Sequence, residues 1–158
     1  MGNRHMDLED VLDLADIYAK RHSGCKKVSV GSIILDQDGN MLSFGANAAI
    51  PDLCKSRECL RIEKYGDNAK EHRLPSDCRA IHSEVDAICH LQGSARGGII
   101  VVTRYPCEAC ARAIVSAGIK TVYYGREQQI SEQTNQIFDN AGVHCYHYST
   151  WNREDTNV

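Results

Sequence analysis

Apolar residues change their spacing along the first part of the chain, and the change predicts two kinds of element. Over residues 7–22 they recur three or four positions apart, which predicts an amphipathic helix. Two apolar runs, 28–35 and 41–44, then flank a polar stretch that contains Asp38-Gly39, a hairpin turn signal. The chain is therefore predicted to begin with a helix that is followed by a β-hairpin.

The chain from residue 81 onward alternates between helical and strand-like patterns. The predicted helices each end near a glycine, and they cover residues 82–91, 107–117 and 132–140. The predicted strands are short and apolar or aromatic, and they cover residues 99–103, 119–124 and 143–148. Alternating elements after a hairpin predict an α/β fold with three αβα layers and a mixed central sheet.

Residues 48–79 form a polar segment between these two regions. The segment has few aliphatic residues and no clear periodicity. A stretch of about 30 such residues is unusually long for a compact domain, so we expect an insertion that is functional or held together by a metal ion. Residues 7–150 are then expected to form one domain, with 1–6 as a tag remnant and 151–158 as a polar tail.

Composition narrows the classes of protein that this chain can represent. A length of 158 residues suits one domain with a sizeable core. The net charge of −3 provides no general attraction to nucleic acid or anionic lipid, and no apolar run is long enough to span a membrane. Eight cysteines without a secretion signal favour metal ligands over disulfides. We therefore expect a cytoplasmic protein (host cytoplasm if viral), with neither a membrane nor a nucleic-acid partner.

Two motifs carry most of the chemical information. His82-Ser83-Glu84 opens one predicted helix, and Pro106-Cys107-Glu108-Ala109-Cys110 opens the next, in a pattern typical of zinc deaminases. Catalytic zinc has three protein ligands and one open position for water, whose pKa falls to about 7. His82, Cys107 and Cys110 supply three ligands, and Glu84 remains as an unligated carboxylate. Glu84 is therefore the expected proton carrier between this water, a ring nitrogen and the departing amine.

Three other interpretations of these motifs stay open. A Cys-x-x-Cys pair alone is more often half of a structural zinc site or a redox pair. A nucleic-acid deaminase acting on a flipped base has the same signature, although the acidic balance and scarcity of aromatic residues count against it. A zinc-stabilised interaction module without catalysis is the third, and such a module has no need of Glu84.

Longer stretches around the motifs resemble the cytidine deaminase superfamily and, more closely, the deoxycytidylate (dCMP) deaminases. The matching stretches are residues 30–34, 45–47, 105–114 and 116–124, and the resemblance covers about residues 8–143. It implies a cytidine deaminase-like fold and hydrolytic loss of the 4-amino group of a cytosine deoxynucleotide. The implied reaction converts dCMP, or a 5-substituted dCMP, to the uracil nucleotide and ammonia. A homo-oligomer, often a hexamer, is also implied.

The resemblance assigns roles to individual residues. It implies that His82, Cys107 and Cys110 hold zinc and that Glu84 moves protons. The residues expected to contact substrate are Asn47, the Ser83 backbone N–H, Tyr105 and Tyr124, the last of which is equally well interpreted as a core aromatic residue. Among the basic residues that could meet a phosphate, Arg112 is preferred over Lys26, Lys27, Arg57 and Arg61.

Two single residues and one short segment depart from the family patterns His-Ala-Glu-x-Asn-Ala and Gly-Tyr-Asn-Gly. Ser83 replaces Ala, which is a mild change. Asp86 replaces Asn, and its carboxylate is expected either to repel a phosphate or to orient a ligand or cap a loop. Gly45-Ala46-Asn47-Ala48 replaces the segment associated with nucleoside-triphosphate control, so regulation by dCTP and dTTP is left open.

A second, structural zinc is implied by resemblance to several dCMP deaminases. Cys54 and Cys59 have structural-zinc spacing, and a polar segment gains order from such a clip. The candidate ligands are Cys25, Cys54, Cys59, His72 and Cys78, with the first three preferred. Five candidates compete for four places, and free thiols or disulfides remain the alternative.

Overall fold

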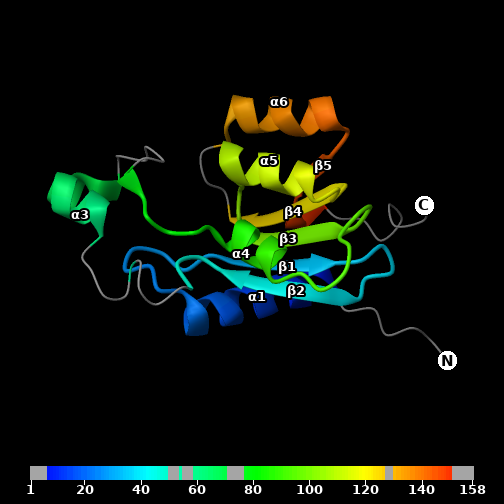
Figure 1. Ribbon diagram of the computed structural model, residues 1–158, viewed down its shortest axis with the longest axis horizontal. Coiled ribbons are helices and arrows are strands. Elements are labelled where there is room, and N and C mark those ends of the chain that lie inside the picture. Colours follow the sequence, from blue (N-terminus) through cyan, green and yellow to red (C-terminus); the bar gives the residue numbers. More distant parts are fainter. Residues whose placement is uncertain (1–6, 50–53, 55–58, 71–76, 127–129, 151–158) are drawn as a thin grey trace.

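The computed structural model describes residues 7–49, 54, 59–70, 77–126 and 130–150. Its α-helices are α1 (Leu8–His22), α3 (Leu60–Tyr65), α4 (Ser83–Cys89), α5 (Glu108–Ser116) and α6 (Glu132–Ala141). Its strands are β1 (Gly31–Leu35), β2 (Met41–Ala46), β3 (Ile99–Arg104), β4 (Thr121–Arg126) and β5 (His144–His147). Two short 3-10 helices, η1 (Gly66–Lys70) and η3 (Tyr148–Thr150), complete the described elements (Figure 1).

The five strands form one mixed sheet in the order β2-β1-β3-β4-β5. Strand β1 is antiparallel to both β2 and β3, as expected for a hairpin whose first strand enters the sheet interior. Strands β3, β4 and β5 run parallel. Parallel neighbours need crossover connections, which α5 and α6 supply. The predicted mixed sheet is therefore confirmed.

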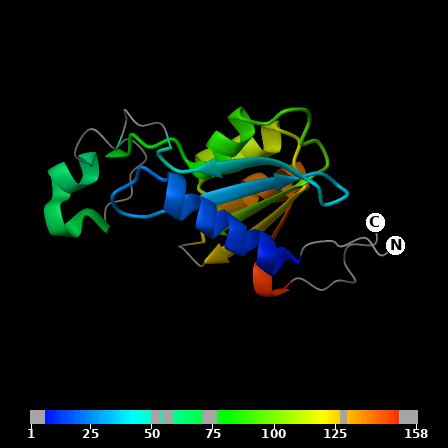
Figure 2. The ribbon, with the colours of Figure 1, turned by 90° about the horizontal axis from the view of Figure 1, so that it is seen from below.

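Helices cover both faces of the sheet, which confirms the three-layer α/β prediction (Figures 1 and 2). Alternate residues along each strand point to opposite faces. Ile33, Val101 and Tyr123 pack with α1, whereas Ile34 and Val102 belong to the larger core beneath α4, α5 and α6. In the described part of the chain, no helix has both the length and the apolar composition needed to cross a bilayer.

The observed elements differ from the predicted ones at the start of β1 and in the polar segment. The strand predicted over 28–35 begins only at Gly31, because the Asn47 side chain binds backbone groups of Val28 and Val30. The polar segment 48–79 contains α3 and η1, which its lack of periodicity did not predict. Helix α3 has no buried residue and lies beyond the sheet (Figures 1 and 2).

A glycine on β2 allows α4 to approach the sheet closely. A Cβ atom at Gly45 would lie 2.1 Å from the Ser83 carbonyl oxygen and 2.5 Å from the Ala87 nitrogen. Both distances are far shorter than any real contact, so only glycine permits this packing. The start of α4, which carries His82 and Glu84, is therefore held directly against β2.

Candidate active site

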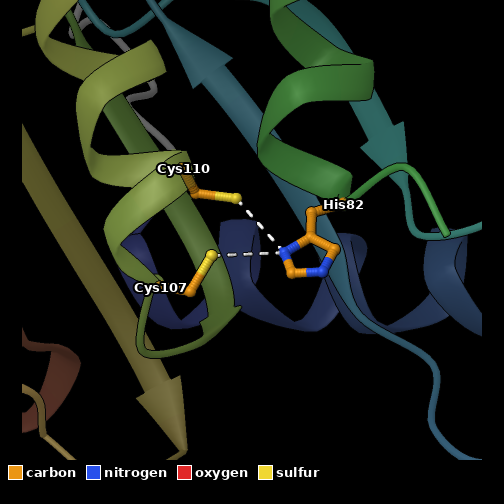
Figure 3. Close-up of side chains that lie close together, drawn as sticks. All are labelled: His82, Cys107 and Cys110. Atoms are coloured by element: carbon orange, nitrogen blue, oxygen red, sulfur yellow. Dashed lines mark hydrogen bonds between the residues drawn. The ribbon is translucent and has the colours of Figure 1, made fainter. Parts of the chain in front are cut away.

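Two helix starts bring the predicted zinc ligands together. His82 is the N-cap of α4, Cys107 is the N-cap of α5, and Cys110 lies in the first turn of α5. Pro106 precedes Cys107, where the absence of an N–H has no consequence for the helix. The positive ends of both helix dipoles face this point and favour anionic ligands. Figure 3 shows the imidazole of His82 turned toward both sulfur atoms.

The distances between these side chains fit a tetrahedral metal ion. Nδ1 of His82 lies 3.4 Å from Sγ of Cys107 and 3.3 Å from Sγ of Cys110. Zinc with ordinary bond lengths places nitrogen and sulfur ligands about 3.5 Å apart. Among the described residues, the group with ligand atoms within 4.8 Å of one another comprises these three members. A zinc ion held by these three residues would keep its fourth position for water.

The protonation of these ligands is set by their contacts with one another. A hydrogen bond from Cys110 and a further one from His82 lower the pKa of the Cys107 thiol to about 3, although burial opposes the shift. Hydrogen bonds with Cys107 and Cys78 raise the pKa of His82 to about 10. These contacts therefore favour the thiolate form of Cys107, which is the form in which a cysteine binds a metal ion.

Glu84 lies beside the ligands as an almost completely buried carboxyl group, only 4% exposed. Burial raises its pKa, while the nearby His82 charge partly opposes this effect. A carboxyl group with a raised pKa exchanges protons at a pH closer to neutrality, as a general acid and base requires. Glu84 also lines the cavity, so it can reach a bound molecule.

A cavity of about 170 Å³ opens over His82 and Glu84. Three of the residues predicted to bind substrate line it, namely Asn47, Ser83 and Tyr105. Four cysteines expected near a second metal also line it, namely Cys25, Cys54, Cys59 and Cys78. Five basic residues complete the polar wall, namely Lys26, Lys27, Arg61, Arg79 and Arg104.

The Asn47 side chain is held by three hydrogen bonds. Its Oδ1 accepts from the Ser23 hydroxyl at 2.7 Å and from the Val30 N–H at 2.8 Å. Its Nδ2 donates to the Val28 carbonyl at 2.9 Å. An amide has two N–H donors, and the hydrogen bonds within the described residues use one of them. The three bonds hold the Asn47 side chain in one orientation on the cavity wall, and its contact with substrate stays a prediction.

Two of the departures from the family pattern, Ala48 and Asp86, meet at the loop that carries Asn47. Ala48 has φ of +52°, a left-handed conformation that costs a non-glycine residue about 1–2 kcal/mol. Asp86 is buried, and its Oδ2 accepts a hydrogen bond from the Ala46 N–H at 3.0 Å. Of the expectations for Asp86, the structure therefore favours capping of this loop. Its carboxylate holds the turn that carries Asn47.

Other predicted residues lie elsewhere. Arg112 is exposed on α5 and pairs with Glu108 at 3.5 Å, away from the cavity wall. Tyr124 belongs to the core and packs edge-on against Tyr105 at 5.0 Å between ring centroids. Its interpretation as a core aromatic residue fits this position. His72 and Arg57 lie outside the described residues.

Sequence reasoning missed two basic residues on the cavity wall. Arg79 stands at the end of the polar segment, where no pattern distinguished it from solvated charges. Arg104 ends β3 directly before Tyr105-Pro106-Cys107. Ligands bind at the carboxyl ends of strands in open α/β sheets, so this position was a usable signal for Arg104.

A three-layer αβα fold with a His-Cys-Cys group and a neighbouring unligated glutamate defines the cytidine deaminase-like class of zinc proteins. The model of the cytidine and deoxycytidylate deaminase zinc-binding region matches residues 6–126 of this chain. The match covers well over half of the chain, and the chain belongs to this family.

Individual relatives agree with this assignment. ComE operon protein 2 of Bacillus subtilis (strain 168) is 35% identical over 126 residues, which are 77% of this chain and 60% of that protein. Deoxycytidylate deaminase of Mus musculus is 29% identical over 119 residues, which are 72% of this chain and 64% of that protein. The chain therefore spans somewhat less than two thirds of the length of these curated relatives.

A solved structure shares the fold. The crystal structure of dCMP deaminase from the cyanophage S-TIM5, in complex with dCMP and dUMP, superposes with a TM-score of 0.64. The alignment covers 88% of this chain and 94% of that chain at 22% identity. At this identity the likeness establishes the fold, and the chemistry is inferred from the site.

Proposed function

We propose that this protein is a zinc-dependent hydrolase that removes the 4-amino group of a cytosine deoxynucleotide. The substrate is dCMP or a 5-substituted dCMP, and the products are the uracil nucleotide and ammonia. Support comes from the family, from relatives that are named deoxycytidylate deaminases, and from the solved relative that holds dCMP and dUMP. The soluble nucleotide is the partner expected for the cavity.

The observation that carries the proposal is the buried carboxyl group of Glu84 beside three candidate metal ligands, two of which, His82 and Cys107, line the same cavity as Glu84. When bound by His82, Cys107 and Cys110, zinc lowers the pKa of water toward 7 and makes hydroxide available. Glu84 takes up the proton of the attacking water and delivers it to the ring nitrogen. It then takes the proton of the added hydroxyl group and delivers it to the amine, which leaves as ammonia while the carbonyl forms. Burial of Glu84 keeps bulk water from competing for these protons.

The charge of the cavity wall favours a phosphorylated substrate over a nucleoside. Five basic residues line the cavity, whereas Glu84 is its only carboxylate among the described residues. Lys27 is fixed by a hydrogen bond from Nζ to the Ala69 carbonyl at 2.8 Å, which stiffens one side of the wall. A phosphate group would be attracted to this wall, and Arg side chains match its geometry. We therefore place the 5′-phosphate near Arg61, Arg79 and Arg104 rather than near Arg112.

The base and sugar would be oriented by Asn47, by the Ser83 backbone N–H and by Tyr105. Asn47 offers one fixed N–H donor to a sugar hydroxyl or a base oxygen. The Tyr105 hydroxyl is occupied by Asn135 of α6, to which it donates at 2.5 Å. Tyr105 therefore contributes its ring face, while its hydroxyl anchors that ring. These contacts would hold the reacting carbon beside the zinc ligands.

A second zinc ion, with a structural role, is part of the proposal. Cys25, Cys54, Cys59 and Cys78 line the same cavity. Burial raises the pKa of the Cys54 thiol, and the nearby Cys25, Cys78 and Cys59 thiols raise it further, so the four thiols are neighbours. Four thiols are a typical structural zinc sphere, but in the described structure their sulfur atoms do not lie within 4.8 Å of one another, so zinc binding would have to draw them together. Cys78 now joins the preferred ligands.

Regulation and assembly are proposed from the family resemblance alone. We propose that dCTP and dTTP act as effectors and that the protein forms a homo-oligomer, with a hexamer as the first model to test. Sedimentation velocity with and without each triphosphate separates these two statements.

The function is tested by comparing Glu84→Gln with Glu108→Gln. Glu108 is half-exposed on α5 between the two cysteine ligands, so it controls for loss of a carboxylate near the metal. Glu84→Gln should retain zinc and lose dCMP turnover by about 10³-fold, in the range expected for a general acid-base group. Glu108→Gln should behave as wild type.

A substrate panel completes this test. The panel contains cytidine, CMP, dCMP, dCTP, and the 5-methyl and 5-hydroxymethyl derivatives of dCMP. Turnover of the monophosphates in preference to cytidine supports the phosphate assignment. Turnover of cytidine alone would refute that assignment, and unchanged turnover by Glu84→Gln would remove Glu84 from the mechanism.

A further inference from the structure

Two buried serine hydroxyl groups form a chain that ends on Glu84. Ser32 lies on β1 and Ser83 is the first residue of α4, and both are 0% exposed. Their Oγ atoms are 2.7 Å apart. The Ser83 hydroxyl also lies 3.1 Å from Oε2 of Glu84. No metal ligand takes part in these contacts, so they are additional to the zinc site.

The chemistry of the groups fixes the direction of this chain. The Ser83 hydroxyl donates to Oε2 of Glu84, which uses its single O–H donor. The Ser83 oxygen then accepts, and the Ser32 hydroxyl is the donor. Hydrogen bonds to a charged acceptor are roughly twice as strong as neutral ones. The chain therefore stabilises one orientation of the Glu84 carboxylate.

The far end of the chain is anchored in the most rigid part of the fold. Ser32 lies on a strand with neighbours on both sides, opposite Gly45 of β2 and Val102 of β3. The terminal torsion of a glutamate side chain is otherwise soft, with a broad distribution. The Ser83 hydroxyl therefore gives this carboxyl group a fixed partner in addition to its contact with the Cys110 thiol.

We propose that Ser83, supported by Ser32, is a positioning residue that holds Oε2 of Glu84 and thereby fixes the orientation of its carboxyl group. This inference rests on the proposed role of Glu84 as proton carrier. Ser83 stands where the family pattern has alanine, so the hydroxyl improves the orientation of Glu84 and is not required for the reaction itself. The expected contribution to kcat is therefore moderate, about tenfold, as for other losses of alignment.

The test compares Ser83→Ala, Ser32→Ala and the double variant with Ser43→Ala. Ser43 on β2 is the matched control, because its hydroxyl is also buried and also binds α4, donating to the Ala87 carbonyl at 2.6 Å. Within the described residues, its hydrogen bond does not involve Glu84. Ser83→Ala should lower kcat about tenfold with unchanged KM and zinc content. Ser32→Ala should lower kcat by a smaller factor, and adding it to Ser83→Ala should have no further effect.

The outcomes separate this inference from the proposed function. Equal kcat values for Ser83→Ala and wild type would overturn the inference while leaving the function intact. Multiplicative effects of the two serine variants would also overturn it. Ser32 acts on Glu84 only through the Ser83 hydroxyl, so removing Ser32 should have no further effect once that hydroxyl is absent. An equal kcat loss in Ser43→Ala would assign the effect to packing.

A measurement without turnover keeps the inference testable whatever the substrate is. Crystal structures of the zinc-loaded variants should show the Glu84 carboxylate rotated or in several conformers in Ser83→Ala. In Ser43→Ala it should be placed as in wild type. An unmoved carboxylate in Ser83→Ala would refute the positioning role.

Discussion

Two groups of candidate metal ligands lie at or beside one cavity but rest on different kinds of structure. His82, Cys107 and Cys110 stand at the starts of α4 and α5, which pack against the sheet. The second group is Cys25, Cys54, Cys59 and Cys78, which come from a loop before β1, the polar segment and the N-cap of α3. The first group is held in place by the core, whereas the second lies on elements with little burial of their own.

This difference has an energetic consequence for metal binding. Both α4 and α5 have several buried residues, whereas α3 has none. A helix without a buried face depends on other interactions to stay ordered. Metal binding at the first site therefore adds chemistry to a structure that already exists. At the second site it would supply part of the folding free energy of the segment.

The sharpest test of this comparison removes one ligand from each group. Cys110→Ser should lose one zinc equivalent and reduce turnover on the order of 10³-fold, because the water is no longer activated. Its hydrogen exchange should stay near that of wild type. Cys54→Ser should lose the other zinc equivalent, retain more than about a tenth of the turnover, and increase exchange across residues 59–70.

Zinc content, turnover and exchange are measured on the same preparations. A wild-type protein with one zinc equivalent would refute the second site. Faster exchange throughout α4 and α5 in Cys110→Ser would show that the first site also depends on its metal for folding.

A pair of glycine substitutions tests how firmly each region is packed. Gly45→Ala forces a Cβ atom into α4 and should destabilise the protein by about 3 kcal/mol through overpacking. Because α4 carries His82, the zinc affinity should also fall about tenfold. Gly66→Ala, in the α3 region, meets open space but has φ of +53° and ψ of −127°, so it should cost about 1–2 kcal/mol through backbone strain alone.

Urea unfolding and zinc titration measure these two effects. The comparison fails if Gly66→Ala is as destabilising as Gly45→Ala, or if Gly45→Ala leaves zinc affinity unchanged.

The smallest expected effect is a pH dependence confined to the α3 region. Asp77 accepts hydrogen bonds from Tyr65 at 2.7 Å and from Lys64 at 3.0 Å, and both contacts lower the pKa of its carboxyl group. A carboxyl group with a lowered pKa in the folded state stabilises that state above its unfolded pKa of about 3.9. This contribution is lost as pH falls through the folded-state pKa.

Hydrogen exchange of α3 in wild type and Asp77→Asn, measured from pH 7 downward, checks the sign. The wild type should be better protected at neutral pH, and the difference should shrink below about pH 4. Thiol protonation affects both proteins equally and cancels in the comparison. A difference that grows on acidification would contradict the assignment.

Local patterns predicted most of the fold and the centre of the site. Period and turn chemistry identified α1, the hairpin and the alternating elements, because each depends on residues close in the chain. His82, Glu84, Cys107 and Cys110 were recognisable since short motifs place them at helix starts. The polar segment escaped prediction, because α3 is stabilised by contacts such as Lys64 with Asp77 rather than by an apolar face.

The sequence by itself determined the main helices and strands, the mixed sheet and the His-Cys-Cys set of candidate metal ligands. Each of these features depends on residues that are close together in the chain. Only the tertiary structure decided which basic residues reach the cavity, placing Arg79 and Arg104 there and Arg112 outside. It also decided that Asp86 holds the Asn47 loop and that Ser32 meets Ser83. These outcomes depend on contacts between segments far apart in the chain, whose distances are set by packing of the whole sheet and its helices.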